Sequence, residues 1–260
     1  MSKQISGTKE WSVASVNCLS GCEHNCRYCY ARANALRFRR ISSPDQWAES
    51  RLRPAEVKRR RRKQSGRVMF PTTHDITPQF LQPCLDVISN ILRAGNDLLI
   101  VSKPHLPCIE AICREGRLFR GAIMFRFSIG SANDSILSYW EPGAPCFEER
   151  LACLRYAHAE GYQTSVSCEP LLDANQAPAL FRELEPFVTD SIWFGKLNKI
   201  RQRCVPGTSR EEIERIEWGQ TPGAIQLIYE LLKDESKVRW KESYKAVLGL
   251  ALADKAGLDR

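Results

Sequence analysis

The stretch "NCLSGCEHNCRYCYAR", residues 17–32, carries four of the chain's eleven cysteines. Four thiols so close together predict a disulfide framework, a zinc site or an iron–sulfur cluster, with coincidence as the remaining alternative. In a reducing compartment thiols stay free, so clustered cysteines there indicate metal ligands rather than disulfides. The seven cysteines outside this stretch show no CxxC spacing, and we expect most of them to be small apolar core residues.

Composition places the chain among globular proteins. Its 260 residues are 43% hydrophobic and 26% charged, enough for one substantial core. No apolar run approaches the length needed to cross a bilayer. The opening residues, "MSKQISGTKEWS", lack the apolar segment of a secretion signal. We therefore expect a cytoplasmic protein with no membrane partner.

The spacing Cys22-x3-Cys26-x2-Cys29 favours an iron–sulfur cluster. Zinc sites usually combine two CxxC pairs, or one pair with two histidines, and no second pair follows. Ferredoxins supply four ligands to each cluster at other spacings. Three ligands leave one iron of a [4Fe–4S] cluster open to a substrate or cofactor. Cys18 lies outside this spacing and is interpreted as a packed or radical-quenching thiol. If it were a fourth ligand, the protein would be an iron–sulfur electron-transfer protein, and this alternative stays open.

Hydrophobic patterning predicts strands that alternate with helices. The predicted strands cover residues 11–17, 67–71, 97–102, 122–130, 163–170 and 190–195. The predicted helices cover residues 24–40, 78–94, 105–115, 146–160 and 175–186, the fourth ending at Gly161. Such alternation implies parallel strands joined by right-handed crossovers. Six units indicate an α/β fold with a partial, open (β/α)6 barrel.

The chain after Cys204 reads as mostly helical. Thr221 caps one predicted helix and Pro222 occupies its first position. We expect a partial barrel over residues 1–205 and a helical extension over 206–260, packed on the same domain. The region 42–66 is the expected irregular insertion.

"CEHNCRYC" followed by "YAR" resembles the cluster loop of radical S-adenosylmethionine (SAM) enzymes, in which an aromatic residue, here Tyr28, precedes the last cysteine. The resemblance implies a [4Fe–4S] cluster held by Cys22, Cys26 and Cys29, with SAM chelated at the open iron. One electron then cleaves SAM into methionine and a 5′-deoxyadenosyl radical. The family fold is a partial (β/α)6 barrel with this loop after the first strand.

Within that superfamily the chain is most similar to the spore photoproduct lyase branch of small radical SAM proteins. The similarity covers about residues 12–172 and is carried by "FSIGSANDSILSYWEPGAPCFEERLACLRYAHAEGY" (127–162), "PTTHDITP" (71–78) and "VSKPHL" (101–106). The chain departs from the branch at His74 and in its basic insertion. A hydrolytic pair of His74 and Asp75 is a weaker alternative, since no second histidine lies nearby.

The resemblance also implies SAM-binding residues at the strand ends, which meet at one mouth of a parallel barrel. They are Lys103 and Ser128 at the methionine carboxylate, Thr72, Thr73 and Asp75 in the loop that receives the amino group, the Tyr28 backbone at the adenine, Arg150 at the pocket floor, and Glu169 at a ribose hydroxyl. Each has a structural alternative: Lys103 as a surface residue, Ser128 as core, and Arg150 paired with Glu148 or Glu149. Cys168 and Cys204 are candidate hydrogen-atom donors, or simply packed cysteines.

Positive charge is concentrated early in the chain. Residues 27–67 hold fourteen Lys and Arg against three Asp and Glu, although the whole chain has a net charge of +8. The centre is "KRRRRK", and six consecutive charges cannot share one face of a helix. The run is either solvated or a nucleic-acid contact made by Lys58, Arg59, Arg60, Arg61, Arg62 and Lys63.

Together these patterns predict a radical SAM enzyme that acts on a nucleic acid or nucleotide. A peptide or small metabolite is the alternative substrate. SAM, a nucleic acid or other polyanion, and an external electron donor are the expected partners.

Overall fold

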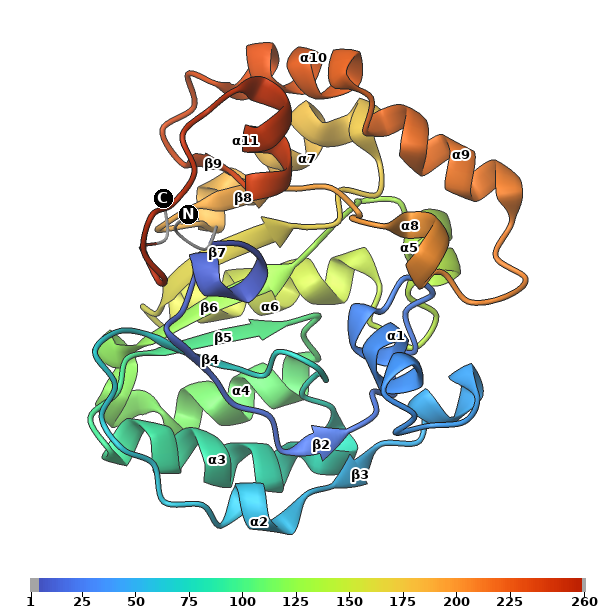
Figure 1. Cartoon of the computed structure of the whole chain (residues 1–260). Coiled ribbons are helices and arrows are strands. Elements are labelled where there is room, and N and C mark those ends of the chain that lie inside the picture. Colours follow the sequence, from blue (N-terminus) through green and yellow to red (C-terminus); the bar gives the residue numbers. More distant parts are fainter. Residues whose placement is uncertain (1–4, 259–260) are drawn as a thin grey trace.

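The structure of the protein, a computed structural model, describes residues 5–258 and is built around a seven-stranded sheet (Figure 1). Neighbouring strands follow the order β1-β4-β5-β6-β7-β8-β9, and every pairing in this sheet is parallel. The strands are β1 (Ala14–Ser15), β4 (Val68–Phe70), β5 (Leu98–Ser102), β6 (Ile123–Ser128), β7 (Gln163–Cys168), β8 (Ile192–Phe194) and β9 (Val238–Trp240). A small antiparallel sheet joins β2 (Leu19–Ser20) to β3 (Arg51–Leu52).

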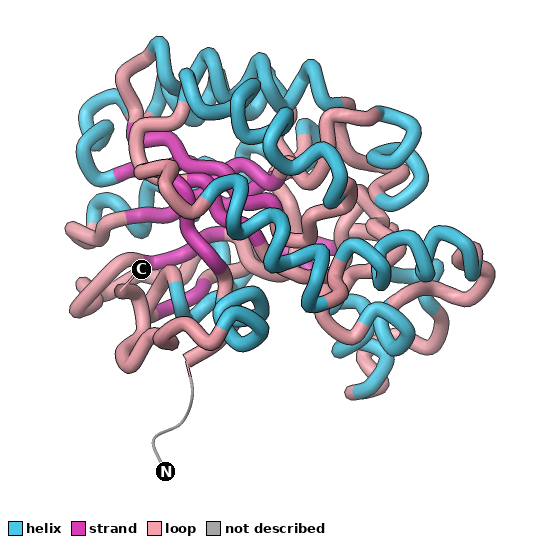
Figure 2. Tube along the Cα trace, turned by 90° about the horizontal axis from the view of Figure 1, so that it is seen from above, coloured by secondary structure: helices cyan, strands magenta, loops and turns pink. Residues whose placement is uncertain are grey.

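Helices surround the strands, which lie together in the centre when the molecule is seen from above (Figure 2). The α-helices are α1 (Tyr30–Arg37), α2 (Pro54–Val57), α3 (Leu81–Arg93), α4 (Leu106–Glu115), α5 (Asp134–Trp140), α6 (Phe147–Ala159), α7 (Ala177–Leu184), α8 (Ile200–Arg203), α9 (Arg210–Gly219), α10 (Pro222–Leu232) and α11 (Glu242–Leu248). The short 3₁₀ helices are η1 (Gly7–Glu10), η2 (Pro44–Trp47), η3 (Pro78–Phe80), η4 (Arg117–Ala122), η5 (Ala174–Gln176) and η6 (Glu185–Phe187). None of the helices in residues 5–258 combines the length and the apolar character that a membrane span needs.

The predicted fold class is confirmed, and all six predicted strands are present within their predicted ranges. Gly161 follows α6 with a φ of 75°, a left-handed conformation that suits glycine at a helix end. The Thr221 side chain caps α10 by accepting a hydrogen bond from the Ala224 backbone. Helical periodicity and the residues at the helix ends were therefore sufficient to predict α6 and the start of α10.

Two sequence expectations were wrong in detail. The helix expected over residues 24–40 begins only at Tyr30, because Cys29 is its N-cap and the cysteines before it form a loop. The C-terminal region contains three helices but also β9, which pairs with β8 as a seventh parallel strand. Three residues between charged neighbours are too few to show a strand period.

Large side chains fill part of the barrel interior. Trp11, Met69, Leu99, Met124 and Trp193 form a buried cluster separate from the main core between sheet and helices. This packing leaves the carboxyl ends of the strands as the place where loops can build a site.

Candidate functional site

The cysteine loop, residues 21–29, lies between β2 and α1. Gly21 has a φ of 94°, and a Cβ there would lie 2.8 Å from the Trp47 carbonyl oxygen. The Cys22 amide donates to that same oxygen at 2.8 Å. Cys29 is the N-cap of α1, and its Sγ accepts from the Arg32 amide at 3.5 Å. The loop is therefore anchored at both ends by the backbone around it.

The segment after α5 packs directly on the cysteine loop. A Cβ on Gly143 would come within 2.3 Å of the Glu23 carbonyl oxygen, so only glycine fits there. The Gly143 amide donates to the His24 carbonyl oxygen at 3.1 Å. Gly143 belongs to the "EPGAP" segment after α5, which thus supports the cysteines from a distant part of the chain.

The three loop thiols have the chemistry of cluster ligands. Cys26 is buried, Cys22 and Cys29 are partly buried, and all eleven cysteines are free. Burial raises the pKa of Cys26 to about 12, and burial together with the charges of Asp75, Cys26 and Cys29 raises that of Cys22 well above its ordinary value. Cys22 and Cys26 are neutral thiols at ordinary pH, and the thiolate forms of the three cysteines would repel one another. A bound cation would therefore stabilise the thiolates.

Within residues 5–258, no three His, Cys, Asp or Glu side chains converge as a single metal ion requires. A [4Fe–4S] cluster bonds each thiolate to a separate iron, so it does not need the sulfurs to meet at one point. Three thiols on one loop are a donor set that a [4Fe–4S] cluster with one open iron could use.

A buried charged group lies beside Cys26. Glu141 is 2% exposed, forms an ion pair with Arg150 at 2.6 Å, and lies 3.9 Å from the Lys103 Nζ. The Tyr28 hydroxyl donates to the same carboxylate. Burial would raise the pKa of Glu141, but Arg150, Lys103 and the Tyr28 hydroxyl hold it below its ordinary value. Arg150 thus pairs with Glu141, not with the Glu148 or Glu149 considered from sequence.

The residues predicted at the methionine carboxylate come together here. Arg150 donates through Nη1 to the Ser128 carbonyl oxygen at 3.1 Å. Its other terminal nitrogen, Nη2, is buried and has no partner among the described residues. An unsatisfied guanidinium N–H is costly, and a bound carboxylate would satisfy it. The site is therefore suited to an anionic group of a ligand.

Asp75 is fully engaged by the protein. Its carboxylate accepts hydrogen bonds from the Ser102 hydroxyl and from the Lys103 amide, the latter at 2.8 Å, and lies 3.2 Å from the His24 Nδ1. Burial would raise its pKa, but the His24, Lys103 and Ser102 contacts lower it. The side chain joins the cysteine loop to the β5 end. His74 points elsewhere: its Nε2 accepts from the Cys18 amide at 3.0 Å.

Thr72 and Thr73 are held by one residue that sequence reasoning missed. The Asn17 Oδ1 accepts from both threonine amides at 2.8 Å, and its Nδ2 donates to the Thr72 Oγ1 at 2.7 Å. Asn17 precedes the cysteines by a few residues, so the two loops predicted to surround SAM share this clamp.

His24 and His105 were also missed as a pair. Their Nε2 atoms are 2.9 Å apart, His24 is 1% exposed, and the His105 Nδ1 lies 3.8 Å from Glu149. His24 stands inside the cysteine motif, which was its only sequence signal.

Glu169 faces a buried lysine. The Lys241 Nζ lies 3.5 Å from Glu169 and also forms an ion pair with Glu10 and a hydrogen bond to the Gly7 carbonyl oxygen. Burial raises the pKa of Glu169, which Lys241 partly offsets. Lys241 carried no sequence signal, since it follows the unpredicted strand β9.

The two candidate hydrogen-atom donors differ in environment. Cys168 ends β7 and is fully buried, and burial raises its pKa. Cys204 is half-buried after α8. Cys204 lies close to the cysteine loop, because the amide of the next residue, Val205, donates to the Arg27 carbonyl oxygen at 3.0 Å. The role of both thiols stays a prediction.

The basic run follows α2 as an irregular segment, as expected for an insertion. Arg59 and Arg61 form ion pairs with Glu56 at 2.9 and 3.5 Å, and Lys63 donates to the Gly95 carbonyl oxygen. The other three cations, Lys58, Arg60 and Arg62, are exposed with no side-chain partner among residues 5–258.

Comparisons with known proteins agree with this architecture. No protein-family model matches the chain. The uncharacterized protein ORF301 of Acidianus two-tailed virus is 25% identical over 223 residues, which cover 78% of this chain and 71% of that protein. Spore photoproduct lyase complexed with dinucleoside spore photoproduct superposes with a TM-score of 0.58 at 17% identity, over 92% of this chain and 78% of the other. A mutant of that lyase with bound AdoMet and dinucleoside spore photoproduct gives 0.53 at 18%, over 85% and 61%. The chain therefore has the fold of spore photoproduct lyase, a partial barrel of parallel strands.

Proposed function

We propose that the protein is a radical SAM enzyme that uses a three-cysteine [4Fe–4S] cluster and acts on a nucleic acid or nucleotide. One observation carries the proposal: three free thiols of one loop lie beside the buried Lys103–Glu141–Arg150 group in a barrel of this fold. When bound, the cluster and SAM supply the radical chemistry.

The chain's own residues would bind the cluster and SAM and orient them. Cys22, Cys26 and Cys29 would hold the cluster. Lys103 and Arg150 would attract the SAM carboxylate, with Ser128 as a further donor. Glu141 keeps both cations in place, because it pairs with each of them.

Cys18 supports this function over the electron-transfer alternative. Its thiol is fully buried and its Sγ lies 3.9 Å from the Sγ of Cys84 on α3. A thiol packed against that helix is poorly placed to be a fourth ligand of a cluster in the 21–29 loop.

Anaerobically reconstituted protein should therefore contain four irons and four sulfides per chain, and SAM should change the electron paramagnetic resonance spectrum of its reduced cluster. With dithionite it should release 5′-deoxyadenosine. A full cluster whose spectrum ignores SAM, and which yields no 5′-deoxyadenosine, would indicate the electron carrier instead.

The substrate class has a separate test. Affinity for DNA or RNA should fall steeply with salt, and replacing Lys58, Arg60 and Arg62 by glutamine should weaken binding and reduce the slope of log affinity against log salt by about three. Filter binding at several salt concentrations measures both. Replacing the exposed Arg114, Arg117 and Arg182 is the control and should change little. Absence of salt-sensitive binding in the wild type would favour a peptide or small metabolite.

A further inference from the structure

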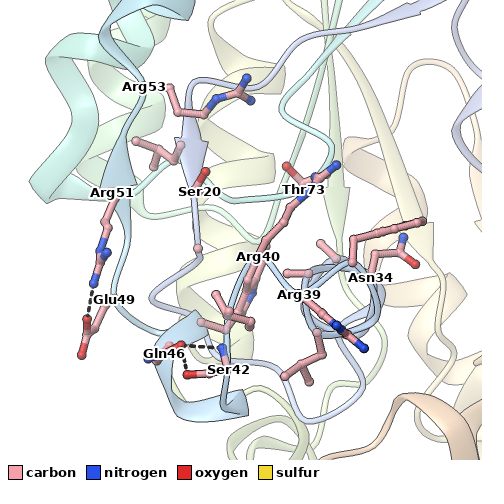
Figure 3. A pocket seen from close by; sticks show the side chains of 18 residues that line it. Ser20, Asn34, Arg39, Arg40, Ser42, Gln46, Glu49, Arg51, Arg53 and Thr73 are labelled. Atoms are coloured by element: carbon pink, nitrogen blue, oxygen red, sulfur yellow. Dashed lines mark hydrogen bonds and ion pairs between the residues drawn. The ribbon is translucent and has the colours of Figure 1, made fainter.

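A pocket lined by four arginines includes Gly21, the first residue of the cysteine loop (Figure 3). It has a volume of about 1010 Å³ and lies between α1, η2 and the β2–β3 sheet. We call it the arginine pocket; its charged lining consists of Arg39, Arg40, Arg51, Arg53 and Glu49. The basic stretch 27–67 contains all four arginines, but no sequence pattern placed them in one pocket.

The pocket carries an excess of positive charge that comes chiefly from Arg39 and Arg40, because Arg53 pairs with Glu56 at 3.7 Å. Its one carboxylate, Glu49, is already paired with Arg51 at 3.1 Å. Arg39 and Arg40 are exposed, and neither forms an ion pair within residues 5–258. The Arg40 guanidinium lies 5.7 Å from the ring centroid of Phe38, an aromatic side chain that is 60% exposed. Exposed aromatic residues, and arginines without an ion-pair partner, are typical of protein–protein interfaces.

The buried wall of the pocket also backs two of the cysteines. Ala31, Ala35 and Trp47 line the pocket and form a small apolar cluster against which Cys22 and Cys29 pack. One layer of side chains therefore separates the pocket from two of the three proposed cluster ligands. Of the predicted SAM-binding residues, only Thr73 reaches the pocket.

We propose that the arginine pocket is the docking surface for an acidic one-electron carrier protein of the flavodoxin type. This inference rests on the proposed function. A carrier flavin that passes on one electron goes from hydroquinone to semiquinone, and a cluster held by Cys22, Cys26 and Cys29 would take up that electron. No atom is transferred. Electron transfer weakens steeply with distance, so docking over Trp47 would bring the two centres close.

The charges fit such a partner. Complexes between redox proteins bury small interfaces and depend on electrostatic steering, for which a basic patch beside the cluster is suited. The pocket is less suited to a nucleic-acid substrate. The reacting C–H bond of such a substrate must reach SAM, which is proposed to bind on the Lys103 and Ser128 side of the loop.

Charge reversal tests the surface. Binding of an acidic flavodoxin to the wild type, measured by calorimetry at low and high salt, should weaken as salt rises. The variant Arg39→Glu/Arg40→Glu should bind at least about tenfold more weakly, since like charges then face each other. The matched control Arg114→Glu/Arg182→Glu has the same net charge but alters exposed arginines on α4 and α7. It should bind as the wild type does.

The kinetics of reduction distinguish a failure of the docking surface from a failure of the proposed function. The pocket variant should lose reduction by flavodoxin hydroquinone, followed spectroscopically, and keep reduction by dithionite. Unchanged flavodoxin binding in the pocket variant would overturn the docking surface, and so would a loss of DNA or RNA binding in place of flavodoxin binding. If instead the wild type holds no cluster or cleaves no SAM with dithionite, the proposed function itself fails.

Discussion

Replacing Cys26 by alanine should abolish 5′-deoxyadenosine formation. Cys26 is the most buried of the three loop thiols. Burial raises its pKa, the charge of Lys103 lowers it, and the charge of Glu141 raises it further. Removing it leaves two thiolates, too few to hold a cluster with one open iron. The reconstituted variant should have little iron and sulfide, and its product yield with dithionite should fall to the level seen without protein.

Two other cysteine variants serve as controls. Cys146→Ala alters an exposed thiol outside the loop and should keep both the cluster and the product yield. Cys18→Ala should also keep the cluster, because Cys18 packs on Cys84. Full product formation by Cys26→Ala would contradict the ligand assignment, and cluster loss in Cys18→Ala would restore the four-ligand alternative.

Replacing Glu141 by glutamine should destabilise the fold by about 3–5 kcal/mol, because it leaves Arg150 charged and buried without its ion pair. Arg150 is fully buried and Glu141 is 2% exposed, so water cannot compensate. Denaturant unfolding of the cluster-free protein at pH 7 measures the loss. The Lys103 position should be disturbed as well, and SAM binding weakened with it.

The matched control is Glu148→Gln. Glu148 pairs with Arg155 at 3.6 Å, but its side chain is 72% exposed, so the expected change is below about 1 kcal/mol. Equal effects of the two substitutions would contradict the buried-pair interpretation.

The effect of Glu141→Gln should depend on pH. The folded-state pKa of Glu141 is lowered from its ordinary 4.5, so its contribution to stability is complete above that value and is lost as the pH falls through the folded-state pKa. The stability gap between wild type and Glu141→Gln should therefore be widest near neutral pH and narrow below about 4.5.

Six of the strands and the position of the cysteine loop were predictable because both are encoded locally. Each of these six strands lies in a β-prone run of its own, and the three cysteines fall within eight residues. The motif resemblance then pointed to Lys103, Ser128 and Arg150, which the fold does bring to one region.

The supporting contacts were not predictable, because they join residues far apart in the sequence. Glu141 lies within the quoted "EPGAP" similarity, yet nothing local shows that it pairs with Arg150 and Lys103. The same holds for the Asn17 clamp on Thr72, which spans 55 positions. Asp75, which is predicted beside the SAM amino group, also contacts His24 and Ser102, and no local pattern indicated either contact.

The pairing of Lys241 with Glu10 has a consequence for biosynthesis. Glu10 is secured by a lysine that is translated more than two hundred codons after it. Until Lys241 has been made, the nascent barrel lacks both β9 and this ion pair, so the η1 turn cannot be held in place while the earlier strands are synthesised.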